Sequence, residues 1–182
     1  MVPNEAGRCA HDPEARHQRL PKSPRIILEA FHSSNRQIVQ ATRSLIETHA
    51  SPGDFPAETA AVDGILAEAG FGLASNAIAG GDRRIADATR IALSSPYLGG
   101  DRLKRRAKGA VVVIHSNGGV SRQEMAQVEH TVKYALRRET PVVIGTVHDD
   151  LLAHNLTRVT ILLSGCCQLA GGTQLKPGGT FS

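Results

Sequence analysis

A run of β-branched residues near the middle of the chain most constrains how it can fold. AVVVIH, at residues 110–115, is apolar at almost every position, which is typical of a strand that is covered on at least one face. Two later segments of similar character, PVVIGTVH at 141–148 and LTRVTILLS at 156–164, predict two further strands. The sequence therefore predicts a sheet in this part of the chain.

Helical signals lie between and before these strands. Ser121 and Glu124 have the spacing of a capping box. After them, apolar residues recur at helical intervals, at Met125, Val128, Val132 and Ala135. Another helix is expected from about residue 82 to residue 95, with Asp82 as its N-cap, and a weaker strand, FGLAS, precedes it. The predicted fold class is α+β: a two-layer sandwich in which helices pack on a four-stranded mixed sheet.

Length and composition set the limits of the domain. A chain of 182 residues has a length typical of one domain. Residues 1–24, rich in proline and charge, predict a flexible arm, and residues 166–182 predict a disordered tail. An odd number of cysteines (three) argues against a disulfide scaffold. With no apolar segment long enough to span a membrane, the sequence predicts a cytoplasmic protein.

A long helix is predicted at residues 25–50, before the compact domain. Its apolar positions fall on one stripe, formed by Ile27, Phe31, Ile38, Thr42 and Leu45. Further apolar residues widen this stripe beyond one side of the helix: Ile26, Leu28, Val39 and Ile46. Because one packed domain covers only one side of a helix, we expect the remainder to be covered by a second copy, by the N-terminal arm or by a partner protein.

The glycines do not form a phosphate-binding loop. No G-x-x-x-x-G-K-[ST] or G-x-G-x-x-G pattern is present, and the glycine pairs stand where turns and helix ends are expected. The sequence therefore predicts no nucleotide cofactor and no catalytic residue.

A metal site is not predicted either. Several possible ligands stand near strand ends: His115, His148, Asp149, Asp150 and His154. A catalytic zinc site needs three convergent ligands with supporting partners, and this spacing does not indicate them. Cys166 and Cys167 are adjacent and do not form a C-x-x-C motif.

Four successive segments between Gly80 and Gly165 carry a family resemblance. They read GGDRRIADATRIALSSPYL, AKGAVVVIHSNGGVSRQE, PVVIGTVHDDLL and RVTILLSG. This succession closely resembles the C-terminal half of FtsZ, the tubulin-like GTPase that polymerises at the bacterial division site, and the likeness extends back to about Ile26. The resemblance implies that residues 51–165 form an FtsZ C-terminal-like domain and that the long helix is equivalent to the central helix of FtsZ. The GTP-binding half has no counterpart here.

The resemblance also implies a filament-contact loop. In FtsZ, an Asn-x-Asp-x-x-Asp pattern after the central helix reaches the neighbouring subunit and positions the water for GTP hydrolysis. The matching segment begins SPGDFPAE, and Asp54, Phe55 and Glu58 are its candidate contact residues. Pro52 and Ala57 stand at the expected Asn and second Asp in one register, so the resemblance does not extend to catalysis. Solvated acids at a helix start are the alternative interpretation of Asp54 and Glu58.

A basic run between the second predicted helix and the strand at 110–115 departs from the family pattern. It contains five positive side chains: Arg102, Lys104, Arg105, Arg106 and Lys108. Such a cluster favours an anionic partner, which is nucleic acid, acidic lipid or an acidic protein tail, and a solvated loop is the alternative. Arg83, Arg84, Arg137 and Arg138 are candidates to extend it. No aromatic residue is interleaved with it, which argues against stacking on single-stranded nucleic acid.

Two functions therefore follow. The first is a non-catalytic FtsZ-like protein that acts by protein association, as a homo-oligomer or with an FtsZ-type partner, and hydrolyses no GTP. The second is a binding module that uses residues 102–108 for an anionic ligand. Similarity of fold does not choose between them.

Overall fold

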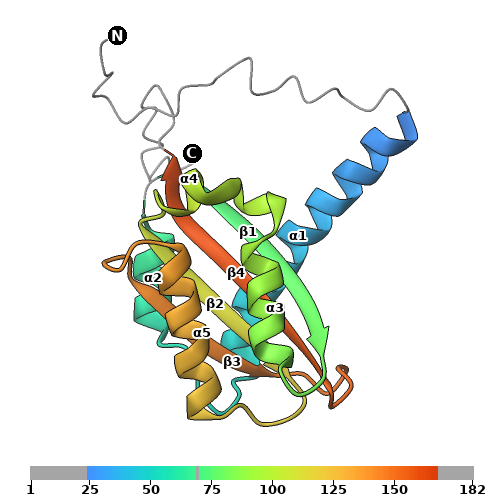
Figure 1. The fold of residues 1–182 in the computed structure, drawn as a ribbon, viewed down its shortest axis with the longest axis vertical. Coiled ribbons are helices and arrows are strands. Elements are labelled where there is room, and N and C mark those ends of the chain that lie inside the picture. The colour runs from blue at the N-terminus through green and yellow to red at the C-terminus, as the bar shows by residue number, and fades with distance from the viewer. Residues whose placement is uncertain (1–23, 69, 168–182) are drawn as a thin grey trace, which may run out of the picture.

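The computed structural model describes residues 24–68 and 70–167. Helices and strands follow one another in a mixed order along this part of the chain (Figure 1). Their bounds are α1 Pro24–Ala50, α2 Thr59–Leu66, β1 Phe71–Gly80, α3 Arg84–Leu93, the 3-10 helix η1 Pro96–Leu98, α4 Gly100–Lys104, β2 Gly109–Ser116, α5 Arg122–Ala135, β3 Val142–His148 and β4 Leu156–Cys167.

The strands form one mixed sheet in the order β1-β4-β2-β3. β4 runs antiparallel to both β1 and β2, whereas β2 and β3 are parallel and are joined through α5. β2 is central, and each of its residues is buried. The predicted α+β class with a four-stranded mixed sheet is thus confirmed.

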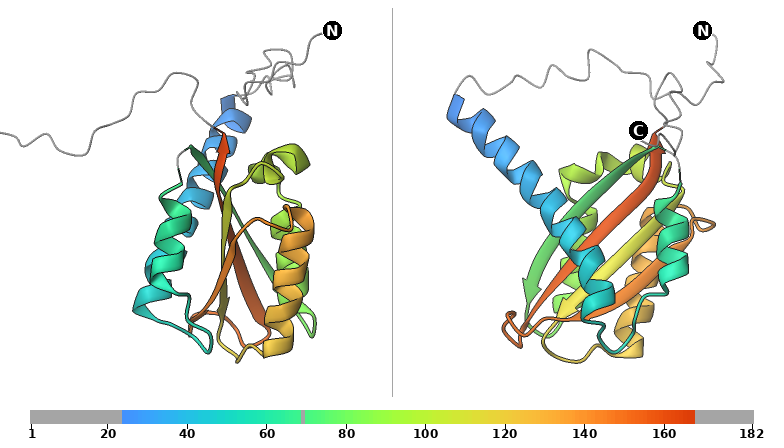
Figure 2. Two further views of the ribbon diagram at one scale, coloured as in Figure 1. Left: turned by 90° about the vertical axis from the view of Figure 1, so that its left-hand side faces the viewer. Right: turned by 180° about the vertical axis from the view of Figure 1, so that it is seen from behind.

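Helices cover both faces of the sheet. α3 and α5 pack on one face, and α1 and α2 lie against the other (Figure 2). The side chains of β2 alternate between the two layers, as the pleat of a strand requires. Val112 and Ile114 enter the larger core under α3 and α5, while Val111 and Val113 enter the smaller core under α2. His115 continues the second set, which directs its imidazole toward α1.

The helix starts agree only in part with the sequence prediction. At the start of α5 the capping box is confirmed, because Ser121 Oγ accepts from Glu124 N and Glu124 Oε2 accepts from Ser121 N. The prediction that Asp82 caps the second helix was wrong. Gly81, with a φ of 90°, opens a turn in which its carbonyl accepts from the N–H of Arg84 at 3.2 Å. α3 therefore begins at Arg84, two residues later than expected.

Pairing within the sheet lengthens two strands beyond their expected ends. β1 extends to Gly80 rather than stopping after FGLAS, because it pairs with β4 along most of its length. β4 extends to Cys167, so Cys166 and Cys167 belong to the sheet although they were assigned to the tail. The rest of that tail and all of the predicted arm except Pro24 lie outside the described residues.

Candidate association surface on helix α1

α1 crosses one face of the sheet and has a covered side and an uncovered side. Its C-terminal half lies over the sheet, whereas its N-terminal part projects beyond the edge formed by β1 (Figure 2). At this edge, Gln37 Oε1 accepts hydrogen bonds from the backbone N and the Nδ2 of Asn76, at 2.9 and 2.8 Å. The helix is thus tied to the edge strand as well as to the face.

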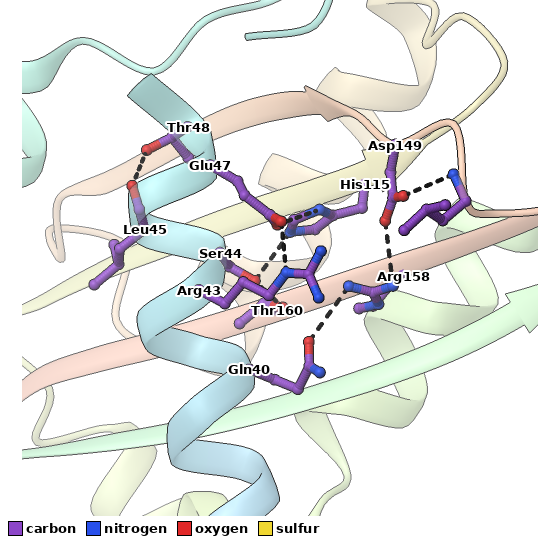
Figure 3. A network of polar contacts seen from close by, with 11 residues as sticks. Gln40, Arg43, Ser44, Leu45, Glu47, Thr48, His115, Asp149, Arg158 and Thr160 are labelled. Carbon is purple, nitrogen blue, oxygen red and sulfur yellow. Dashed lines mark hydrogen bonds and ion pairs between the residues drawn. The ribbon is translucent and has the colours of Figure 1, made fainter. Parts of the chain in front are cut away.

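A network of polar side chains fixes the C-terminal half of α1 to the sheet (Figure 3). Ser44 Oγ lies 2.9 Å from His115 Nε2 and 3.0 Å from Thr160 Oγ1, and all three residues are buried. Beside them, Arg158 donates to Gln40 Oε1 at 3.3 Å and pairs with Asp149 at 3.2 Å. The network therefore joins α1 to β2 and β4, and Asp149 ties it to the segment after β3.

His115 is neutral in this setting. Burial lowers its pKa from 6.5 to about 4, and the positive charge of Arg158 acts in the same direction. Glu47 opposes the shift, but its Oε2 remains 3.5 Å from His115 Nδ1. Neither of these two atoms has a hydrogen-bond partner among the described residues. The contact between α1 and the sheet therefore contains two buried polar atoms without hydrogen bonds in the described part of the chain, Glu47 Oε2 and His115 Nδ1.

The outer side of α1 is apolar and open. Ile38, Val39 and Ile46 are 61, 62 and 63 % exposed, which is unusual for aliphatic side chains that share one helix. Thr42 lies with them along a shallow hollow of about 440 Å³. A second hollow of about 280 Å³ lies between α1 and the sheet, where Leu45 contributes to its lining. These hollows form a mainly apolar surface of the kind that binds a partner.

The predicted association helix is thus divided by the structure. Ile38 and Val39 point outward, whereas Leu45 is half-buried against the smaller core. The backbones of Ile27 and Phe31 lie in α1, but their side chains are outside the described part of the structure. Ile46, which the sequence placed with Val39 on the widened part of the stripe, is as exposed as Val39.

The predicted filament-contact loop is attached to the edge strand β3. Phe55 O accepts from Thr146 N at 2.8 Å, and Phe55 N donates to the side-chain Oγ1 of Thr146 at 2.8 Å. Gly53 N donates to Thr146 O at 2.8 Å. The Oδ2 of Asp54 accepts from Val120 N at 3.0 Å, which holds the loop before α5. Glu58 is exposed at the start of α2 and makes no side-chain cap. Asp54 therefore has a structural partner within the chain, whereas Glu58 has none of the capping bonds expected of a helix-start acid.

The basic run at 102–108 does not form one charged face. Lys104 is buried, where its Nζ donates to Leu93 O at 3.0 Å and pairs with Asp101 at 2.8 Å. Lys108 pairs with Glu68 at 3.2 Å, and Arg106 is half-buried. Arg102 and Arg105 remain exposed. The short α4, which was not predicted, accounts for this division because its turn directs Lys104 toward the end of α3.

The possible metal ligands lie in other interactions. His148 Nε2 is 2.9 Å from Asp150 Oδ1, Asp149 pairs with Arg158, and His115 contacts Ser44. His154 is exposed in the connection between β3 and β4. Within residues 24–68 and 70–167, no group of three or more such side chains is placed to hold a metal ion.

Together, the fold and this surface define a class of domain: a mixed α+β sandwich that carries a long helix covered on only one side. Residues 66–167 match the family model described as "FtsZ family, C-terminal domain". The chain belongs to the FtsZ family.

Relatives of known sequence support this assignment. The chain is 32 % identical over 139 residues to the cell division protein FtsZ of Buchnera aphidicola subsp. Baizongia pistaciae, and this match covers 76 % of the chain and 36 % of the relative. With the FtsZ of Coxiella burnetii it is 30 % identical over 154 residues, covering 83 % and 39 % of the two chains. The chain therefore spans less than half the length of these relatives.

Solved structures show the same fold. The structure titled "FtsZ dimer, empty (M. jannaschii)" matches 79 % of this chain and 40 % of its own, with a TM-score of 0.66 and 23 % sequence identity. A second structure, an FtsZ W319Y mutant from M. jannaschii, has the same TM-score at 22 % identity. None of the helices in the described ranges is both long enough and apolar enough to cross a membrane.

Proposed function

We propose that this chain is a cytoplasmic FtsZ-type association domain that acts through protein contacts and hydrolyses no GTP of its own. The observation that carries the proposal is the open apolar side of α1, at Ile38, Val39 and Ile46. Burying a large aliphatic side chain stabilises a complex by roughly 1.5–3 kcal/mol, so three of them give a strong drive toward a partner. The partner we propose is an FtsZ-type chain, either a second copy or another family member.

The non-catalytic part of the proposal is supported by the segment after α1. GTP hydrolysis across a filament contact requires carboxylates that are free to polarise a water molecule. Asp54 instead uses Oδ2 to hold Val120 N, and Pro52 makes an isolated bridge to Val147 of β3. This segment is therefore built to fasten α1 to the edge of the sheet.

Co-sedimentation with an authentic FtsZ in the presence of GTP tests the proposed function. We expect the chain to enter the pellet with the polymer, or to change polymer mass and GTP turnover. The Val39→Ser/Ile46→Ser double variant should lose this effect, because it replaces two outward side chains with polar ones. Ile91→Ser is the matched control, since Ile91 is also an exposed helical isoleucine but lies on α3, on the opposite face of the sheet. An equal loss in both variants, or no effect of the unmodified chain, would refute the proposal.

The side-chain positions of residues 102–108 argue against the alternative function, in which this run forms an anionic-ligand site. Lys104 is held inside the domain at Leu93 O, and Lys108 pairs with Glu68. Arg102, Arg105 and Lys108 remain exposed in that run, and Lys108 is the one of these three that pairs with Glu68. Any anionic site must therefore draw its charge from another part of the chain.

A further inference from the structure

We propose that a basic hollow at the end of α5 binds single-stranded nucleic acid, with phosphates on its arginines and a base stacked on Tyr134. The hollow has a volume of about 650 Å³. It is lined by residues from α5, from the turn that follows α5 and from the end of α4: Arg105, His130, Lys133, Tyr134, Arg137 and Arg138. We call this the basic hollow.

The positive charge of the basic hollow is largely uncompensated. Arg105, Arg137 and Arg138 are exposed, and no side-chain hydrogen bond or salt bridge links them to other described residues, although Arg105 interacts electrostatically with the exposed carboxylate of Asp101. Lys133 is paired with Glu129 at 2.6 Å, so it contributes less. Guanidinium groups bind phosphate oxygens through two parallel N–H donors, which makes three convergent arginines a fitting site for a phosphodiester chain.

The local fold explains only part of this arrangement. Arg137 and Arg138 follow Leu136, the C-cap of α5, where positive charge offsets the negative end of the helix dipole. Arg105 comes from another element, as the C-cap of α4. α4 and the last turn of α5 lie on the same side of the sheet (Figure 1), and this placement adds the third arginine to the site. The dipole of α4 explains a positive residue at its C-cap, but it does not require this residue to share a hollow with the arginines after α5.

Tyr134 decides the class of ligand. Its side chain is 84 % exposed, although an aromatic ring of this size is ordinarily at least partly covered. An open ring beside arginines is the arrangement in which bases of a single strand stack while the phosphates are held by cations. No local sequence pattern indicates this arrangement, because Tyr134 stands far along the chain from Arg105.

The basic hollow is separate from the proposed association surface. It belongs to the face covered by α3 and α5, whereas α1 lies on the opposite face (Figure 2). Loss of association through α1 should therefore leave nucleic-acid binding intact, and loss of nucleic-acid binding should leave association intact.

Fluorescence anisotropy with a labelled oligothymidylate of about 20 nucleotides tests the proposal, because it offers bases and phosphates without secondary structure. We expect saturable binding that weakens as salt is raised, since phosphate contacts release counterions. Arg105→Ala/Arg137→Ala should weaken binding at least about tenfold through loss of two phosphate contacts. Tyr134→Ala should weaken it about fivefold through loss of stacking, with little change in salt dependence.

The controls separate this site from a general effect of charge. Arg83→Ala/Arg102→Ala removes two exposed arginines outside the basic hollow and should leave affinity within about twofold. Val39→Ser/Ile46→Ser should also bind oligothymidylate normally, which keeps this test distinct from that of the proposed function. Thermal unfolding of each variant checks that the fold is intact.

Three outcomes would overturn the proposal. The first is an absence of saturable binding by the unmodified chain. The second is equal weakening in the Arg83→Ala/Arg102→Ala control. The third is binding of a poly-glutamate peptide, or of vesicles containing phosphatidylserine, that is as tight as oligothymidylate binding and equally sensitive to Tyr134→Ala.

Discussion

His115 Nε2 on the central strand lies 2.9 Å from Ser44 Oγ on α1, inside a fully buried site. This contact explains how a long helix that is open on its outer side is nevertheless held in a fixed position on the sheet. Because the joint is polar and buried, its strength depends on the protonation of one imidazole.

The stability of the domain should fall as the pH is lowered through the titration range of His115. Its folded pKa, about 4, is below the ordinary value of 6.5, so the folded state favours the neutral form. The full contribution is therefore present above about pH 6.5 and is lost as the pH falls toward 4. A shift of this size corresponds to about 3 kcal/mol. Urea unfolding at pH 7 and at pH 4.5 measures it.

Replacing His115 separates its effect from general acid destabilisation. His115→Gln should be less stable than the parent at pH 7, but its stability should change less between pH 7 and pH 4.5. His154→Gln is the matched control, because His154 is exposed and should keep the parental pH dependence. The same pH dependence in the parent and in His115→Gln would contradict the assignment.

Lys104→Ala should destabilise the fold by about 1–3 kcal/mol, because it removes a buried donor from the Leu93 carbonyl at the end of α3. Arg102→Ala, two residues earlier and exposed, should change the free energy of unfolding by less than about 0.5 kcal/mol. Denaturant unfolding of the two variants measures this difference. If Lys104→Ala and Arg102→Ala were equally stable, Lys104 would be a surface charge, as its position in the basic run at 102–108 suggested.

Asp54→Ala should cost about 1–2 kcal/mol of stability, because Val120 N loses its acceptor and the segment after α1 is released from the loop before α5. Asp54→Asn keeps an acceptor oxygen and should recover most of the loss. Glu58→Ala, which removes an exposed side chain without a cap, should be nearly neutral. Denaturant unfolding combined with hydrogen exchange at Val120 provides the measurement. Unchanged protection of the Val120 amide in Asp54→Ala would refute the structural role of Asp54.

The sequence predicts those features that depend on neighbouring residues. The strand at 110–115 and the capping box of Ser121 and Glu124 are local patterns, and both are confirmed. Arg158 could not be placed beside His115 from sequence, because their proximity follows from the antiparallel register of β2 and β4. The inward turn of Lys104 depends on the packing of α4 against the end of α3.

The same reason explains the outcome for the candidate sites. Periodicity alone marked α1 as apolar on more than one side, but only the sheet decides that Leu45 faces inward and Val39 outward. The basic run was identified by counting charges along the chain, which cannot show that Arg105 shares a hollow with Arg137 and Tyr134. Surfaces assembled from distant segments require the tertiary structure.

Sedimentation velocity at micromolar concentration tests the proposed association surface most directly. The unmodified chain should sediment as a dimer or larger species, or do so on addition of an FtsZ-type partner, and Val39→Ser/Ile46→Ser should shift it to the free monomer. Ile91→Ser/Leu151→Ser removes two comparably exposed aliphatic side chains away from α1 and should leave the assembly intact. A stable monomer that does not bind such a partner, although α1 is folded and its apolar side is uncovered, would contradict the proposed association surface.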